Sequence, residues 1–203
     1  MGGTMTAAKS VEHRQSWPVP PLDGYTVDDL FTLPDLPSHT ELIDGSLIIV
    51  SPQRYFHFLV MELLMKGIRQ ALPPELKVVR EMAVVLDRQN VPEPDISVVH
   101  ASSISGPDLT RFEAEDVLLA VEVVSPESES RDRTTKPMKY AAAGIPNYWR
   151  VERGGADDIR PVVHVYELDP MTHAYVHMGL QREQLKVGKP YAIEIDLTAI
   201  DEL

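Results

Sequence analysis

The sequence contains no cysteine among its 203 residues. This absence excludes disulfide bonds and thiolate metal sites, and it fits a cytoplasmic location, where disulfides are rare. No uninterrupted apolar run reaches the roughly 18 residues that a membrane-spanning helix needs. Residues 1–16 also lack the apolar segment of a secretory signal. We therefore expect a cytoplasmic protein without a membrane partner.

Basic residues are scarce. The chain carries 19 Lys and Arg against 31 Asp and Glu, a net charge of −12. This balance argues against a surface covered in phosphate-binding lysines, so any binding of nucleic acid has to depend on metal ions and a few local contacts. The length fits one domain. We expect a disordered or extended proline-rich lead at 1–22 and a single domain at 23–203.

Periodicity and turn residues predict the elements of this domain. Thr26 and Asp29 have the spacing of a capping box at the start of a short helix, and Asp44-Gly45 predicts a tight hairpin. Apolar residues recur at helical spacing over 53–72. Further strands are expected at 77–87, 95–99, 117–124, 147–152, 162–168, 175–180 and 191–195, with a loop at 101–116. This order predicts an α/β (α+β) fold with a mixed β-sheet flanked by helices, an N-terminal hairpin and C-terminal antiparallel strands.

Two acidic residues interrupt the apolar strands. Glu122 stands inside the run at 117–124, and Asp95 opens the strand before it. A carboxylate among Leu, Ala and Val is costly unless a cation or hydrogen-bond donors meet it. Lys136 follows in the next expected helix, which ends at Gly144 before Pro146. The residues alone allow either a structural ion pair or a site for a divalent metal.

The ordered set around these acids carries a family resemblance. It comprises Pro94-Asp95, Glu122-Val-Val-Ser-Pro126, Asp132-Arg133, Lys136, Tyr140, Gly144 and Tyr148-Trp149. In this set the chain resembles the Uma-type restriction-endonuclease-like family of the PD-(D/E)xK nuclease superfamily, over roughly 41–152. Members of that family are mostly bacterial. The resemblance implies an αβββαβ restriction-endonuclease-like core and metal-dependent cleavage of phosphodiester bonds.

The resemblance also implies roles for single residues. Asp95, Glu122 and Lys136 would be catalytic, and Mg²⁺ or Mn²⁺ would be held by the two carboxylates and the backbone carbonyl of Val123. Such oxygen ligands suit a hard cation. A cation at the phosphate and an activated water are what the hydrolysis requires.

The sequence departs from the superfamily pattern at the lysine. The pattern places a lysine two residues after the acid, on the same strand face, where this chain has Val124. Lys136 is the expected substitute, reaching Glu122 across the turn at Ser125-Pro126. Since proline is tolerated only in a first helical turn, Pro137 indicates that the helix begins near Lys136, with Thr134 or Thr135 as its cap.

Three further residues are candidates for accessory roles. Glu41 resembles a family acid that extends the metal shell, although a solvated acid at a strand end is an equal alternative. His57 has the reach to contact phosphate or water, while a lone histidine on a helix is more often structural. Tyr140 lies one turn after Lys136 and could hold the lysine, but packing of its ring is the stronger expectation.

Three functions remain open on the sequence. The first is a magnesium-dependent endonuclease acting on nucleic acid, with DNA as the expected substrate. The second is a catalytically degenerate nuclease-fold module that binds without cutting, which Val124, Pro137 and the acidic charge favour. The third is a hydrolase of small phosphate esters. A homodimer is expected for the first, because cutting both strands of a duplex needs two sites.

Overall fold

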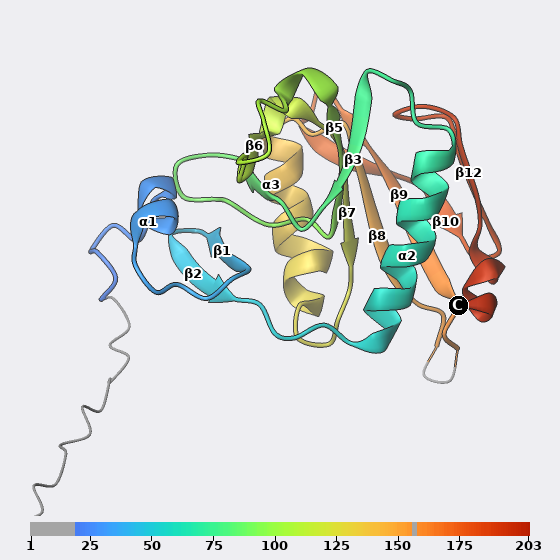
Figure 1. Cartoon of the computed structure of the whole chain (residues 1–203), viewed down its shortest axis with the longest axis horizontal. Coiled ribbons are helices and arrows are strands. Elements are labelled where there is room, and N and C mark those ends of the chain that lie inside the picture. The colour runs from blue at the N-terminus through green and yellow to red at the C-terminus, as the bar shows by residue number, and fades with distance from the viewer. Residues whose placement is uncertain (1–18, 156–157) are drawn as a thin grey trace, which may run out of the picture.

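The computed structural model describes residues 19–155 and 158–203 (Figure 1). The sequence predicted an extended lead at 1–22, and residues 1–18 of that lead lie outside the described residues. A six-stranded mixed sheet forms the centre of the described chain. In spatial order its strands are β10 (Ala174–Gln181), β9 (Pro161–Asp169), β8 (Asn147–Arg153), β7 (Val117–Val123), β5 (Ile96–His100) and β3 (Leu76–Arg80).

One pair of neighbours in this sheet, β7 and β8, is parallel, and the other pairs are antiparallel. A parallel pair requires a crossover connection. Helix α3 (Lys136–Ala142) provides it, while helix α2 (Tyr55–Gln70) precedes β3. The chain order α2-β3-β5-β7-α3-β8 is the αβββαβ core that the sequence led us to expect, and the mixed sheet flanked by helices is confirmed.

The two faces of the sheet pack against different helices (Figure 1). Alternation along β7 sends Leu119 and Val121 to the face covered by α2, and Ala120 to the face covered by α3. Strand β7 is therefore buried on both sides, which explains its continuous apolar run. The same alternation places Glu122 on the α3 face.

Helix α2 carries its apolar stripe toward the sheet as expected, and a small hairpin covers it from another side. That hairpin joins β11 (Gln184–Val187) to β12 (Ile193–Asp196). A side chain at Gly67 would come within 2.5 Å of Ile195, so only glycine lets β12 approach the helix this closely. Strand β11 was missing from the sequence prediction. The 3₁₀ helix η4 (Leu197–Glu202) ends the chain.

The N-terminal elements agree with the sequence prediction. Helix α1 (Val27–Thr32) starts at a complete capping box between Thr26 and Asp29. Strands β1 (Thr40–Ile43) and β2 (Ser46–Ile49) form the hairpin. Its two turn residues, Asp44 and Gly45, both have positive φ, 49° and 70°, as a type I′ turn requires.

The strand expected at 77–87 was wrong as a single element. Glu81, at φ 51°, breaks it into β3 and β4 (Ala83–Val85). Strand β4 pairs in parallel with β6 (Arg111–Glu113), which lies in the segment expected to be a loop. That segment also contains the short 3₁₀ helices η1 (Ala101–Ser103) and η2 (Ala114–Asp116). A three-residue strand whose partner is distant in sequence leaves too little periodicity to detect.

Helix α3 begins at Lys136, as expected, but the turn before it differs from the prediction. A π-helical turn, η3 (Arg131–Thr135), runs directly into α3, and neither expected threonine caps the helix. Thr134 instead donates its hydroxyl hydrogen to the carbonyl of Ser130 at 2.5 Å. Widening the helix just before Pro137 relieves the clash that its ring would make with the carbonyl four residues earlier. The predicted end is confirmed, since Gly144 has φ 86°.

Candidate active site

Asp95 and Glu122 lie next to each other at one end of the sheet. In the antiparallel pair of β5 and β7, Ile96 is opposite Val121. One step further in this register, Asp95 is opposite Glu122. Asp95 also accepts a hydrogen bond from the backbone N–H of Val123 at 2.6 Å, which ties the end of β5 to the end of β7. The expectation that two neighbouring strands each deliver one acid to the same place is thus confirmed.

Lys136 reaches Glu122 as the sequence analysis expected. Its ammonium Nζ lies 3.0 Å from Glu122 Oε1, 2.7 Å from Glu41 Oε1 and 3.7 Å from Asp132 Oδ1. The Lys136 side chain is only 6% exposed. The ammonium therefore lies in a buried cage of three acids that come from β1, β7 and the π-helical turn.

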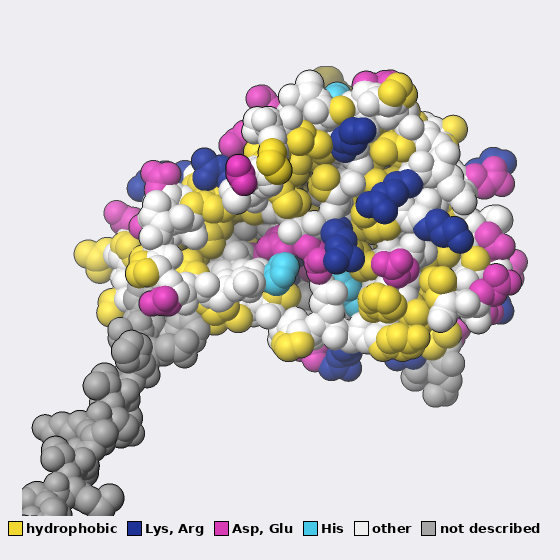
Figure 2. All heavy atoms as spheres, viewed as in Figure 1, with side chains coloured by type: hydrophobic (Ala, Val, Ile, Leu, Met, Phe, Trp, Pro, Cys, Tyr) yellow, Lys and Arg dark blue, Asp and Glu magenta, His cyan; other side chains and the backbone are white. Residues whose placement is uncertain are grey.

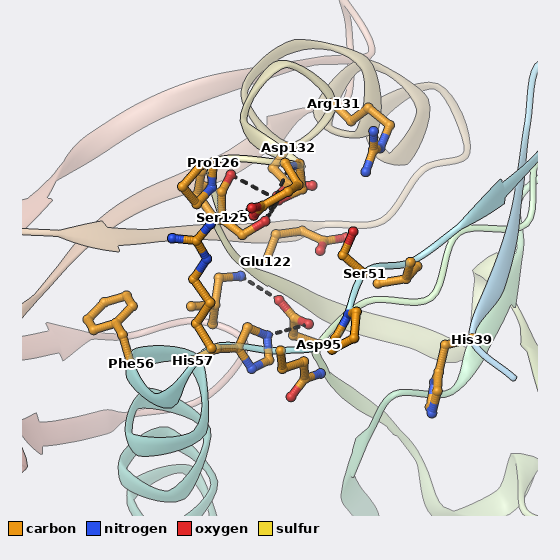
Figure 3. Close-up of a pocket in the computed structure, with 18 of the residues that line it drawn as sticks. His39, Ser51, Phe56, His57, Asp95, Glu122, Ser125, Pro126, Arg131 and Asp132 are labelled. Carbon is orange, nitrogen blue, oxygen red and sulfur yellow. Dashed lines mark hydrogen bonds and ion pairs between the residues drawn. The ribbon is translucent and has the colours of Figure 1, made fainter.

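Tyr140 and His57 hold the two central acids. The Tyr140 hydroxyl donates to Glu122 Oε1 at 2.6 Å, and its ring is fully buried. The prediction that its ring packs is therefore confirmed, while the suggested contact with the lysine was wrong, because the hydroxyl meets the carboxylate instead. His57 Nε2 lies 2.8 Å from Asp95 Oδ1 (Figure 3). The accessory histidine thus contacts a predicted metal ligand.

Glu41 is not a solvated strand-end acid. It is 2% exposed, and besides Lys136 it accepts a hydrogen bond from the backbone N–H of Glu93 at 2.9 Å. The hairpin of β1 and β2 therefore delivers a buried acid to the cage. This contradicts the solvated alternative, while the predicted role of Glu41 in extending the metal shell stays a prediction.

Burial and neighbouring charges shift the pKa values of Glu122 and Lys136. Burial raises the pKa of Glu122 well above its usual range, the Lys136 charge opposes this, and the charges of Asp132, Asp95 and Glu41 add to it. Burial lowers the pKa of Lys136, but the surrounding acids outweigh burial and raise it well above the usual value. Lys136 therefore stays protonated, and Glu122 retains its proton more readily than an exposed carboxyl group does.

A pocket of about 460 Å³ opens onto this cage. Its wall combines the acids with several arginines and apolar side chains, among them Arg131, Arg153, Val50, Phe56, Pro126 and Ile159. Figure 3 shows Arg131 extending from the π-helical turn into the pocket. Its Nε is buried and has no hydrogen-bond partner. The pocket thus combines an arginine whose Nε has no hydrogen-bond partner with a group of carboxylates.

Comparison with known proteins identifies the family of the chain. The model of the Uma2 family, described as "Putative restriction endonuclease", matches residues 27–198. The chain belongs to the Uma2 family. The match includes every element of the site, from Glu41 on β1 to Lys136 and Tyr140 on α3.

One solved structure has the same fold as this Uma2 member. It is described as "a putative nuclease belonging to DUF820 from Anabaena variabilis ATCC 29413". The similarity has a TM-score of 0.66 at 17% identity and covers 87% of this chain and 97% of that one. At this identity the likeness concerns the fold. No curated protein matches the chain.

The cage together with Asp95 offers carboxylate oxygens of the kind that bind a divalent cation, but several of these oxygens already accept hydrogen bonds. Glu41, Asp95, Glu122 and Asp132 face one lysine and one histidine, and Asp132 Oδ1 is buried without a hydrogen-bond partner. A divalent cation would neutralise this excess of acids. Among residues 19–155 and 158–203, no three histidine or acidic side chains are arranged to hold a metal. Both oxygens of Asp95 accept hydrogen bonds, so its carboxylate would have to exchange a partner to bind one.

Asp132 is the member of the cage to which the sequence analysis gave no role. It belongs to the family pattern and stands four residues before Lys136, a spacing that brings two helical side chains together. It is 1% exposed, and burial raises its pKa against the opposing charge of Lys136. Its burial depends on the widened turn before α3, for which the sequence gives no periodic signal.

No helix among the described residues is long and apolar enough to span a membrane.

Proposed function

We propose that this Uma2 protein is a metal-dependent endonuclease that hydrolyses phosphodiester bonds of nucleic acid, with DNA as the expected substrate. One observation carries the proposal. The ammonium of a buried lysine lies 3.0 Å from Glu122 at the end of β7, beside Asp95, in a pocket open to solvent. A lysine from a helix thus lies beside Glu122, whereas the strand itself has Val124 at the usual lysine position.

In this proposal the acids bind the metal ion, and the lysine acts on the water and the phosphate. Asp95, Glu122 and the Val123 carbonyl would hold Mg²⁺ or Mn²⁺, which when bound neutralises phosphate charge and lowers the pKa of a bound water. Lys136 has a raised pKa and stays an ammonium, so it orients the attacking water and stabilises charge on the phosphate and does not act as a base. Glu41 and Asp132 keep that ammonium in place. Tyr140 fixes the Glu122 carboxylate by its hydrogen bond.

The hydrogen bonding of Asp95 supports a second candidate. Its two oxygens accept from His57 and from the Val123 N–H, so the carboxylate is fully engaged without a cation. A nuclease-fold module that binds nucleic acid without cutting would have this arrangement. Metal binding distinguishes the two candidates.

Calorimetric titration with Mg²⁺ and with Mn²⁺ is the decisive measurement. Asp95→Asn keeps an acceptor for the Val123 N–H but removes the charge, and should abolish binding. Asp108→Asn, an exposed change in the segment before β6, is the matched control and should bind like the wild type. A wild type that binds neither ion would refute the metal-dependent nuclease and support the binding module.

Cleavage assays then test the substrate. We expect nicking of supercoiled plasmid in Mn²⁺, lost in Glu122→Gln. Cleavage of bis(p-nitrophenyl) phosphate without cleavage of plasmid would point instead to a hydrolase of small esters. A homodimer belongs to the proposal only if both strands of a duplex are cut at one place, which sedimentation together with the proportion of linear product would show.

A further inference from the structure

Helix α2 exposes two aromatic rings where it meets the pocket. Tyr55 and Phe58 are 69% and 53% exposed. Their rings are nearly parallel, at 15°, with centroids 6.1 Å apart. Tyr55 lines the pocket and Phe58 follows one turn along the outer face of the helix. Tyr55 therefore places one exposed ring at the pocket, and Phe58 adds a second exposed ring next to it, outside the pocket lining.

Other exposed apolar side chains gather at the same rim. Val50 and Ile159 line the pocket and are 38% and 43% exposed. Figure 2 shows hydrophobic surface over the N-terminal end of α2, next to the acidic and histidine side chains at the centre of that face. A contiguous exposed apolar surface beside a pocket marks a binding site more often than scattered exposed residues do.

Cations outnumber acids along the segment that contains the aromatic pair, although they lie further along α2 and on β3. Residues 54–80 carry five Lys or Arg and two Glu, in a chain whose net charge is −12. Four of these cations, Lys66, Arg69, Lys77 and Arg80, are exposed on α2 and β3. Arg131 lines the pocket, and its Nε is buried without a hydrogen-bond partner. Aromatic faces beside cations form the combination that binds an unpaired nucleic-acid strand.

We propose that the substrate class of this site is single-stranded nucleic acid, with unpaired bases stacked on Tyr55 and Phe58 and a phosphate bound by Arg131. This inference rests on the proposed nuclease function for the position of the cleaved bond. An unpaired base offers its face to a ring, whereas bases in a duplex cover one another. A pocket of about 460 Å³ accommodates a ligand of nucleotide size. A chain with this net charge also lacks the cation density that would bind a duplex along its length.

Binding measured without cleavage tests the proposal. Fluorescence anisotropy, measured both in EDTA and in Ca²⁺, compares a labelled oligothymidine with a labelled duplex of the same length. We expect the wild type to bind the single strand at least about tenfold more tightly than the duplex. The double variant Tyr55→Ala, Phe58→Ala should bind the single strand about tenfold or more weakly than the wild type, since each stacked base contributes substantially.

Two controls separate stacking from misfolding and from loss of exposed apolar surface in general. Swapping the rings, as Tyr55→Phe with Phe58→Tyr, should retain wild-type binding. Met171→Ala removes another exposed apolar side chain, 89% exposed between β9 and β10, and should have no effect. Equal binding of duplex and single strand, no binding of the single strand, or a double variant that binds like the wild type would each overturn the proposal.

Arg131→Gln gives a second and independent reading. Losing one phosphate contact on a single strand should reduce the slope of log K against log salt by about 0.7. An unchanged slope would remove Arg131 from the strand path. A wild type that shows ring-dependent strand binding but never cuts would refute the nuclease function and leave this inference standing. A protein that cuts plasmid, but whose strand binding does not depend on the two rings, would refute this inference and leave the nuclease function standing.

Discussion

The two faces of the central sheet serve different purposes. On the face covered by α2, buried side chains such as Leu64, Val121 and Trp149 form an apolar cluster. On the face covered by α3, Glu122 of strand β7, the strand that also carries Val121, contacts the buried Lys136. One residue of offset along β7 separates the two, because strand side chains alternate. Strand β7 thus provides both apolar packing and an acid of the proposed active site.

The difference has an energetic consequence. Each large apolar side chain buried on the α2 face contributes about 1.5–3 kcal/mol. The cage on the α3 face is weak evidence for stability, because removing charges from water offsets most of their attraction. Removing a single partner from such a cage is nevertheless costly, because the remaining charges stay buried. The apolar cluster beneath α2, which includes Leu64, should therefore govern folding alone, and the α3 face should govern folding and function together.

Lys136→Met is the change expected to have the largest effect. It removes the ammonium that three acids surround, so cleavage should fall by at least about 10²- to 10³-fold. Stability should fall by about 3–5 kcal/mol, as for other broken buried pairs. Plasmid nicking in Mn²⁺ and urea unfolding measure the two effects. The acids remain, so Mn²⁺ affinity measured by calorimetry should be nearly intact.

Lys139→Met is the matched control for this change. Lys139 is on the same helix, but its ammonium contacts Asp44 at the surface, 2.5 Å away, and does not reach the cage. It should leave both cleavage and stability close to wild type. If Lys136→Met nicked plasmid at the wild-type rate, the lysine that replaces the missing strand residue would not be catalytic.

The same comparison shows what the sequence could and could not predict. The run at 117–124 predicted β7, and the ordered acids predicted that Asp95, Glu122 and Lys136 meet. The burial of Glu41 was open, since it depends on how the hairpin folds back onto residues 91–93, a contact between distant segments. Asp132 and Arg131 lie on a π-helical turn, for which no local pattern exists. Local periodicity therefore identified the strands, while the cage depends on tertiary contacts.

Leu64→Ala tests the other face. Leu64 is fully buried against the sheet. Its truncation leaves a cavity and should cost about 2–5 kcal/mol of unfolding free energy. At temperatures where the variant is folded, its Mn²⁺ affinity and cleavage rate should equal those of the wild type. A loss of metal affinity comparable to that of Asp95→Asn would show that the two faces are not independent.

Metal should stabilise the protein through the α3 face. Acids that raise one another's pKa values repel, and a cation bound only by the folded state removes this repulsion. An ion at about 100 times its dissociation constant adds about 2.7 kcal/mol. Thermal melting in EDTA and in excess Mn²⁺ should therefore differ by several degrees for the wild type and for Leu64→Ala, but not for Asp95→Asn. Identical melting of the wild type in both solutions would favour the binding module.

The smallest effect concerns a part of the α3 face outside the cage. Burial lowers the pKa of His164, and the charge of Arg150, its cross-strand neighbour, lowers it further. The unfolded chain then binds the proton more readily, so stability rises with pH between the folded and unfolded pKa values. The contribution of His164 to stability is thus fully present above about pH 6.5 and is lost as the pH falls toward the lower pKa of the folded state.

The variant His164→Gln should lose less stability between about pH 8 and about pH 5 than the wild type does. The difference should be less than about 0.5 kcal/mol, because the ring is partly solvated. Urea unfolding at both pH values measures this difference, with His173→Gln in the turn between β9 and β10 as the exposed control. A wild type that gains stability toward pH 5 relative to His164→Gln would mean that the ring is better accommodated when charged.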